Sequence, residues 1–409
     1  MDQPFFSIVI PTKDRPECVS ILLESVRNQS YQDYEVIVSD NALENPCKEI
    51  VDNMQDSRFF YFRTDKVLGI CDSFESAISH ASGKWVLMFG DKNILYPDAL
   101  DKLHTVVCRE DPQVINFGQD YLSPDDASDS LVRGKLKRLK RTGEYSRVDL
   151  QMALESHMSC GYLMAGYDRQ CYIGNIYAGG GYKKSFVNRI RLLHGSGRVF
   201  DGIVPDRYGA VEALCMADDV IWLDDHICIY NLCGKNTWSG TIKKGYDSLR
   251  GFVSHSRADK DYSDQLFIPG VVASVSNIIA SDYHNAVIAA VSSGYYKRKK
   301  TAINRVRLAA LVEKELMGVR DISDGVMDDQ KKLVNAYIRQ FDESEQKLLQ
   351  EYRKQEEKRK KLDSVKAKAD RIFRNGMYCG WKPAEAFSKG MEKKLSKNSF
   401  FIKDLSDIR

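Results

Sequence analysis

The chain has 409 residues, of which 43% are hydrophobic and 29% charged, and its formal net charge is +3. This length favours two or three domains over a single compact core. A net charge this small argues against nucleic acid as a partner. The ten cysteines form no CxxC pair and show no zinc-ligand spacing, a pattern typical of reduced thiols in a cytoplasmic protein.

Strand and helix patterns alternate over residues 1–120. Short apolar runs predict buried strands, and these runs lie at residues 5–10, 34–40, 59–63, 85–89 and 114–117. Segments with apolar residues at helical spacing separate most of these runs. The alternation predicts an α/β fold in which helices flank both faces of a mostly parallel sheet. Polar residues that follow the carboxyl ends of such strands usually face a ligand.

Two further regions follow the alternating one. Residues 121–245 are loop-rich and include the glycine run 179–181, which lacks the spacing of a phosphate-binding P-loop and predicts a mobile turn. Residues 246–409 have a helical character, and residues 344–374 lack Gly and Pro and consist mostly of strong helix formers. We therefore expect three regions, 1–120, 121–245 and 246–409, of which the last is a C-terminal helical region.

The long helix expected at about 344–374 is basic and carries only a thin apolar stripe. Three interpretations of its charged side stay open: a solvated face, a surface for a partner or a second copy of the chain, and a contact with an anionic membrane surface. No apolar stretch reaches about 18 residues, so no membrane-spanning helix is expected. Any membrane contact is therefore expected to be peripheral, at the inner face of the membrane.

Two N-terminal segments resemble family 2 glycosyltransferases, which have a GT-A, Rossmann-like fold. They are "FSIVIPTKDRPECVSILLESVRNQSYQDYEVIVSDN" (6–41) and "ASGKWVLMFGDKNILYPDAL" (81–100). A weaker match, "IVPDRYGAVEAL" (203–214) followed by "CIYNLCGKNTWSG" (228–240), resembles the acceptor half of bacterial sugar transferases that build surface polysaccharides. In this resemblance, residues 1–120 form the half that binds the nucleotide sugar and residues 121–245 form the half that binds the acceptor.

The resemblance implies an inverting enzyme of the hexosyltransferase class. It would move a sugar from a nucleotide-diphosphate donor, with a UDP-sugar expected, to a hydroxyl of a glycan or a lipid-linked glycan. Five residues at the ends of the first two strands are implied to bind the nucleotide: Pro11, Thr12, Asp14, Arg15 and Asp40. The alternative is structural, because Asp is also suited to helix starts and turns.

The resemblance also implies an Asp-x-Asp element after the fourth strand, where carboxylates hold a divalent cation bound to the diphosphate. This chain keeps Asp91 and has Lys92 and Asn93 where carboxylates usually stand. Three interpretations stay open. Asp91 binds Mn²⁺ or Mg²⁺ almost alone, or Lys92 contacts the diphosphate in place of the metal, or the site has kept binding and lost turnover.

Asp206 is the expected general base. An inverting transfer needs a carboxylate beside the acceptor hydroxyl, and relatives place an acidic residue at a helix start in this part of the chain. Asp201 is the reserve candidate, and helix capping is the structural alternative for Asp206.

A polar loop follows the apolar run that contains "HICIY". In relatives such a loop closes over the diphosphate or the acceptor sugar. The residues expected to do so here are Lys235, Asn236 and Trp238.

Two other functions stay open. One is a non-catalytic protein, for binding nucleotide sugars or for scaffolding, whose Asp-x-Asp site has decayed. The other is a sugar nucleotidyltransferase, but those enzymes carry a glycine-rich phosphate loop after the first strand, and "PTKDRPE" contains no glycine.

Overall fold

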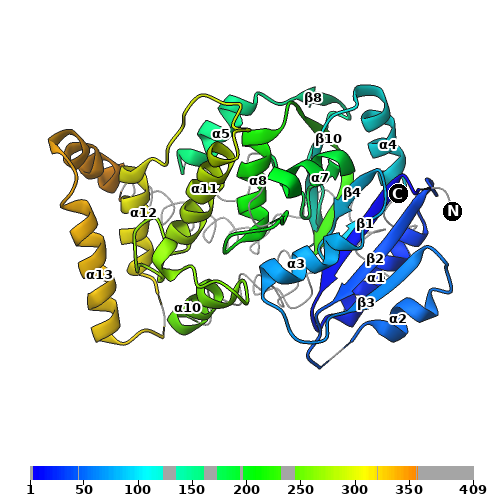
Figure 1. The fold of residues 1–409 in the computed structure, drawn as a ribbon, viewed down its shortest axis with the longest axis horizontal. Coiled ribbons are helices and arrows are strands. Elements are labelled where there is room, and N and C mark those ends of the chain that lie inside the picture. The colour runs from blue at the N-terminus through cyan, green and yellow to red at the C-terminus, as the bar shows by residue number, and fades with distance from the viewer. Residues whose placement is uncertain are drawn as a thin grey trace, which may run out of the picture.

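The computed structural model describes residues 3–44, 46–122, 135–160, 173–193, 197–231, 245–319, 321–355 and 357. Figure 1 shows a large β-sheet with its helices on one side of the molecule and a group of helices on the other, with α8 between the two parts.

One sheet contains the strands of the described part of the chain. These are β1 (Phe6–Thr12), β2 (Tyr34–Asp40), β3 (Phe59–Arg63), β4 (Trp85–Met88), β5 (Asn93–Leu95), β6 (Val114–Leu122), β7 (Leu136–Lys137), β8 (Tyr145–Arg147), β9 (Gly180–Lys183) and β10 (Val220–Asn231). Their order is β3-β2-β1-β4-β9-β6-β10-β5, with β7 paired to β6 and β8 to β10. The longest pairings are parallel, between β1 and β2 and between β6 and β10. The predicted α/β fold with a mostly parallel sheet is confirmed.

The helices fall into two groups. Those that lie between strands along the chain are α1 (Pro16–Arg27), α2 (Lys48–Asn53), α3 (Ile70–Ser79), α4 (Ala99–Glu110), α5 (Leu150–Met158), α7 (Lys184–Leu193) and α8 (Pro205–Met216). The helical region contains α10 (Tyr246–His255), α11 (Val275–Ser292), α12 (Arg305–Leu316), α13 (Asp324–Ile338) and a helical stretch over 343–355. In Figure 1, α11 lies beside α8, and α12 and α13 lie farther from the sheet.

Side chains of β1 alternate between two apolar cores, one on each face of the sheet. Phe6, Ile8 and Ile10 pack in the core that α1 and α4 cover, whereas Val9 belongs to the core that α3 and α8 cover. The second core continues from α8 into α11 and α12. Residues on both sides of the expected boundary at 245 therefore contribute to one core. The three-region division itself stays a prediction.

Strand β1 extends two residues beyond the predicted run and includes Pro11. The carbonyl of Val9 faces β4, where it accepts from the Phe89 N–H at 2.9 Å, so the backbone of Pro11 faces the same side. Strand β4 ends at Met88, and no N–H of Pro11 is needed there. Proline therefore fits at this point of a central strand.

Gly180 and Gly181 open strand β9, between β4 and β6, so the mobile turn predicted at 179–181 is wrong for these two residues; Gly179 lies in the turn just before the strand. A Cβ at Gly180 would lie 2.1 Å from the Asn175 carbonyl oxygen, and one at Gly181 would lie 2.3 Å from Leu87 Cδ2. Glycine is needed here for close packing and not for chain mobility.

The long basic helix is described only over its first part. Residues 343–355 are helical, and Leu349 is fully buried. Arg353 Nε donates to Glu313 of α12 at 2.9 Å, so this part of the helix packs on the helical region. The remainder of the range 344–374 lies outside the described residues.

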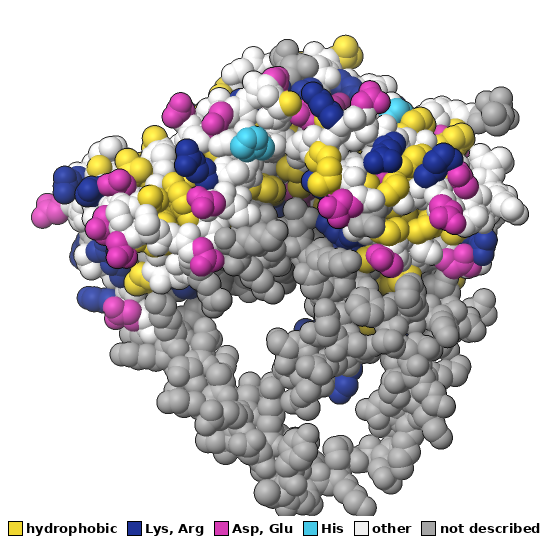
Figure 2. Space-filling view, turned by 90° about the horizontal axis from the view of Figure 1, so that it is seen from below, with side chains coloured by type: hydrophobic (Ala, Val, Ile, Leu, Met, Phe, Trp, Pro, Cys, Tyr) yellow, Lys and Arg dark blue, Asp and Glu magenta, His cyan; other side chains and the backbone are white. Residues whose placement is uncertain are grey.

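On the face seen in Figure 2, Lys and Arg side chains alternate with Asp and Glu side chains, without a large patch of one sign among the described residues. Within the described ranges, none of the helices combines the length and the apolar character that a membrane span requires. Neither observation decides between the interpretations of the basic helix.

His157 of α5 is 1% exposed, and its ring lies 5.3 Å from the ring of Tyr283 in α11. Its Nδ1 lies 3.0 Å from the carbonyl oxygen of Ala153. Burial lowers the pKa of His157 from 6.5 to about 4. At a pH between these two values, the unfolded chain binds a proton at His157 and the folded protein does not.

We expect the free energy of unfolding to fall as the pH is lowered from about 6.5 to about 4, because the unfolded state binds a proton at His157 that the folded state excludes. The loss over the whole window is about 3 kcal/mol. Urea unfolding at several pH values measures it. His157→Gln should show a shallower fall between about pH 6.5 and pH 5, and equal slopes for both proteins would contradict the assignment.

Candidate active site

Polar residues gather where β1, β2 and β4 end. The parallel register places Thr12, the last residue of β1, beside Asp40, the last residue of β2. Asp91 follows the end of β4, which pairs with β1 on its other edge. The sheet topology thus puts Asp40 and Asp91 on either side of Thr12, as expected for the carboxyl edge of a parallel sheet.

Asp91 is 1% exposed, and both of its carboxylate oxygens have partners. Arg15 Nη1 donates to Oδ1 at 2.7 Å and to Oδ2 at 3.0 Å. Thr12 Oγ1 donates to Oδ2 at 2.9 Å. Thr12 and Arg15, which are predicted site residues after the first strand, therefore bind Asp91, the predicted site residue after the fourth strand.

The ion pair is largely removed from water, because the Arg15 side chain is only 15% exposed. Burial lowers the pKa of the Arg15 guanidinium, but the charge of Asp91 opposes this and the pKa ends above its ordinary value. A buried pair of this kind is costly to break, because one charge is then left without compensation.

Lys92 lies in the turn that links β4 to β5, and Asn93 is the first residue of β5. Asn93 is buried, and its Oδ1 accepts the Gly90 N–H at 2.9 Å, which closes the turn. Lys92 is 5% exposed, and its Nζ lies 5.3 Å from the ring centroid of Tyr230 in β10. The Asn93 side chain thus closes the turn, and Lys92 places a buried positive charge near the Tyr230 ring of β10.

The described residues do not fit a metal ion held by protein ligands. No group of three or more His, Cys, Asp or Glu side chains in the described ranges is arranged to hold one. The expected ligand Asp91 already accepts bonds from Arg15 and Thr12 on its two oxygens. A cation at Asp91 would have to displace the guanidinium, so we derive no step through a metal.

The side chains of Asp40 and Asp14 both accept hydrogen bonds from backbone N–H groups. The carboxylate of Asp40 is fully buried and accepts from the Ala42 N–H at 2.9 Å, the Cys47 N–H at 2.7 Å and the Tyr61 hydroxyl at 2.9 Å. The structural alternative for Asp40, a turn-forming aspartate, agrees with these bonds.

Asp14 has a positive φ of 54°, and its Oδ1 accepts the N–H groups of Leu43 and Glu44 at 3.0 and 2.9 Å. It therefore fixes the loop after β2 against the loop after β1.

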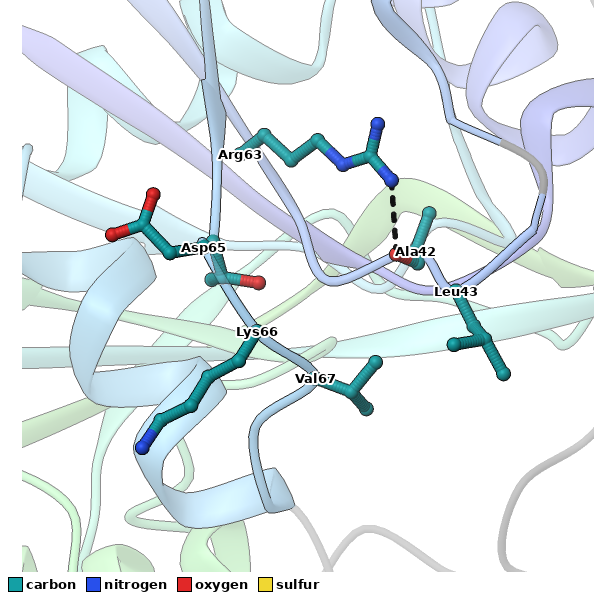
Figure 3. Close-up of a pocket in the computed structure, with 7 residues that line it drawn as sticks. Ala42, Leu43, Arg63, Asp65, Lys66 and Val67 are labelled. Carbon is teal, nitrogen blue, oxygen red and sulfur yellow. Dashed lines mark hydrogen bonds between the residues drawn. The ribbon is translucent and has the colours of Figure 1, made fainter.

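A pocket of about 450 Å³ opens beside this loop. It is lined by Ala42, Leu43, Arg63, Thr64, Asp65, Lys66 and Val67, from the last residue of β3 and the loops that follow β2 and β3. Figure 3 shows Arg63 reaching toward Ala42, whose carbonyl oxygen lies 3.4 Å from Nη2, while Lys66 points away from Arg63. Sequence reasoning missed this pocket, although the polar residues after the strand at 59–63 follow the same strand-end rule.

Asp206 lies in the first turn of α8, where the sequence predicted a helix start. Its side chain is 20% exposed, and Arg207 Nε is 4.0 Å from Oδ2. Pro205 occupies the first turn as well, a position that suits proline because its N–H would have no helical partner there. A carboxylate at this place is accessible enough to meet a substrate hydroxyl.

The reserve candidate Asp201 differs in its surroundings. It is 7% exposed, and Arg257 Nη1 donates to its Oδ1 at 3.0 Å. The Tyr262 hydroxyl and the Gly202 N–H also donate to the same oxygen. These bonds give Asp201 a structural role, so Asp206 is the better candidate for the base.

The three predicted aspartates share electrostatic neighbours. Burial raises the pKa of the Cys47 thiol to about 12, and the charges of Asp40 and Asp91 add to the rise. Burial also raises the pKa of Tyr177 well above its usual value, with contributions from both Asp91 and Asp206. Tyr177 also lies beside the tip after β4, because a Cβ at Gly90 would be 2.7 Å from its hydroxyl oxygen. No sequence signal pointed to Tyr177.

The predicted loop with Lys235, Asn236 and Trp238 lies outside the described residues. The remaining predicted positions gather at the carboxyl edge of the sheet and at the start of α8.

Comparison with known proteins defines the class. Residues 7–170 match the family described as glycosyl transferase family 2. This is the family that the N-terminal segments of the sequence resemble, and the match confirms that resemblance.

Curated relatives are similar over shorter stretches. One is the GalNAc(5)-diNAcBac-PP-undecaprenol beta-1,3-glucosyltransferase of Campylobacter jejuni, 28% identical over 153 residues, which cover 37% of this chain and 48% of the relative. Another is the abequosyltransferase RfbV of Salmonella typhimurium, 34% identical over 104 residues, which cover 24% of this chain and 31% of the relative. The chain spans less than half the length of these relatives.

A crystal structure of S. aureus TarS residues 1–349 in complex with UDP-GlcNAc superposes with a TM-score of 0.45 and 11% sequence identity. The superposition covers 82% of this chain and 92% of that one. A score of this size describes a loose similarity only.

Arg15→Ala is expected to lower the free energy of unfolding by about 3 kcal/mol, because it leaves the buried Asp91 carboxylate without its counter-charge. Urea unfolding measures the change. The double variant Arg15→Ala with Asp91→Asn should lose less than the sum of the two single variants. Additive losses would show that the ion pair is not coupled energetically.

Proposed function

We propose that the chain is an inverting glycosyltransferase. It moves a sugar from a nucleotide-diphosphate donor, a UDP-sugar by the resemblance of its sequence, to a hydroxyl of a glycan or a lipid-linked glycan. The family match of residues 7–170 supports the transfer chemistry. The names of the relatives support an acceptor in bacterial glycan synthesis, since one of them names an undecaprenol-linked diphosphate glycan.

The surroundings of Tyr177 carry the proposal. Its hydroxyl lies beside the tip after β4, where a Cβ at Gly90 would be 2.7 Å away, and the charges of both Asp91 and Asp206 add to the rise of its pKa that burial causes. A donor held at the sheet edge would therefore have its reacting carbon near Asp206. This juxtaposition is what a sugar transfer needs and what a plain binding module does not.

The donor is proposed to lie across the strand ends. The pocket at Arg63 and Val67 suits the base and ribose in size and in its polar rim. The diphosphate would then lie toward Arg15 and Lys92, whose positive charges oppose the negative charge of the leaving nucleotide. Asp40 and Asp14 support this arrangement by fixing the two loops.

The proposed step is a single displacement. The acceptor hydroxyl oxygen attacks the anomeric carbon, the bond from that carbon to the nucleotide diphosphate breaks, and the configuration inverts. Asp206 takes the hydroxyl proton as the new bond forms. The nucleotide diphosphate leaves with the electron pair of the broken bond.

Mn²⁺ or Mg²⁺ stays a prediction of the resemblance, and the proposed step does not depend on it. Location stays a proposal too: a cytoplasmic enzyme with peripheral contact at the inner face of the membrane, where a lipid-linked acceptor would be reached.

Asp206→Asn is expected to lower kcat by about 10³-fold, because the acceptor proton then has no base. Donor binding should stay within about twofold, since Asp206 does not touch the donor phosphates in this proposal. Release of nucleotide from a panel of sugar donors and acceptors measures kcat, and calorimetry measures binding. Asp201→Asn is the matched comparison, and its effect should track its loss of stability. Near-normal turnover of Asp206→Asn would remove this residue from the role.

UDP is expected to raise the melting temperature more than GDP, CDP or ADP do, because a ligand that binds the folded state stabilises it. The rise should persist in EDTA, since Arg15 and Lys92 supply the positive charge at the diphosphate. A rise that needs added Mn²⁺ or Mg²⁺ would instead support the metal interpretation of Asp91. Binding without turnover on any donor would favour the non-catalytic alternative.

A further inference from the structure

The segment 201–204, which leads into α8, is held by the helical region. Ser256, directly after α10, donates its hydroxyl to the carbonyl oxygens of Gly202 at 3.1 Å and Ile203 at 2.9 Å. The Tyr262 hydroxyl accepts the Gly202 N–H at 3.1 Å. Residues of the helical region therefore hold the backbone that leads into α8.

Asp282, in the middle of α11, contacts the same segment and is more buried than Ser256 and Tyr262. It is fully buried, and its two carboxylate oxygens accept the N–H groups of Ile203 at 2.8 Å and Val204 at 2.6 Å. Val204 precedes α8 and has no side-chain cap of its own. The two oxygens of Asp282 therefore act as a cap that another helix supplies to the backbone just before the first turn of α8.

Gly202 shows how closely Asp282 approaches this backbone. Its φ is +80°, a value that glycine adopts readily and other residues rarely. A Cβ at this position would lie 2.5 Å from Asp282 Oδ1. The turn and the carboxylate thus fit each other only with glycine at this position.

We propose that Asp282 is a positioning residue for the transfer step: it fixes the start of α8 and thereby aims Asp206 at the acceptor hydroxyl. The inference rests on the proposed function, in which Asp206 is the base. Asp206 follows Val204 by two residues, so a shift of the backbone at Val204 moves its carboxylate. A displacement of about 1 Å at a reacting group costs about 100-fold in rate.

Stability alone gives a poor reason for a carboxylate at this place. Burial raises the pKa of Asp282 well above its usual value, although the bonds from Ile203 and Val204 oppose the rise. A neutral side chain would avoid that desolvation cost. Only a carboxylate, however, offers one acceptor oxygen to each of the two N–H groups.

The test compares Asp282→Asn with Ser281→Ala. Ser281 is the neighbouring residue on α11, is also fully buried, and also accepts a backbone N–H, from Phe267 at 2.7 Å. Phe267 lies away from α8 in sequence and carries no part of the proposed site. Three measurements are made on the full chain: kcat and KM of transfer, melting temperature, and hydrogen exchange of the peptide 201–208.

Asp282→Asn is expected to lower kcat by about 10- to 100-fold and to leave the donor KM within about twofold. Exchange at Ile203 and Val204 should be at least about 10-fold faster, because an amide group presents only one acceptor oxygen to two N–H groups. Ser281→Ala should lower the melting temperature and leave both kcat and the exchange of 201–208 unchanged.

Normal kcat in a folded Asp282→Asn protein would overturn the proposal, as would unchanged exchange of 201–208. A kcat loss that merely follows melting temperature in both variants would overturn it as well. If the wild type transfers no sugar, the proposed function fails instead. Exchange then still decides whether Asp282 fixes the start of α8.

Gly202→Ala provides a second variant in case Asp282→Asn does not fold. Its Cβ would push against the Asp282 carboxylate, so the same fall in kcat at unchanged donor KM is expected. A folded Gly202→Ala protein with normal kcat would count against the proposal.

Discussion

The buried ion pair between Arg15 and Asp91 is the constraint on which the candidate site depends. It joins the loop after β1 to the tip after β4, across 76 positions of the chain, and Thr12 completes it with a third bond. Both charges are largely removed from water, so each is stable only while the other is present. The strand ends are therefore held in one arrangement before any substrate arrives.

This pair also gives a physical meaning to the altered sequence of the tip. Where relatives of the resemblance have several carboxylates, this chain has one carboxylate that the chain itself neutralises. Lys92 adds a further positive charge against the ring of Tyr230. The charged groups at this tip are thus one carboxylate and two basic side chains that belong to the chain itself.

The α/β part could be predicted well from the sequence, and the partners of its polar residues could not. Apolar runs located the strands from β1 to β4 and β6, because a buried parallel strand must be apolar on both faces. Strand β9 could not be predicted in this way, because its glycines carry no side-chain pattern. The bonds of Arg15 to Asp91 and of Asp282 to Ile203 join residues 76 and 79 positions apart. Such contacts follow from topology, and residue spacing does not encode them.

The place of β9 in the sheet has a consequence for how the chain can be divided. Strands β4 and β6 both belong to the first 122 residues, yet they do not pair with each other, because β9 from much later in the chain lies between them. A fragment that stopped after β6 would carry two bare inner edges in the middle of its sheet, with unpaired backbone groups open to other chains. The part of the chain up to β6 is therefore not an independent module. Its sheet is complete only after the chain has been synthesised through β9.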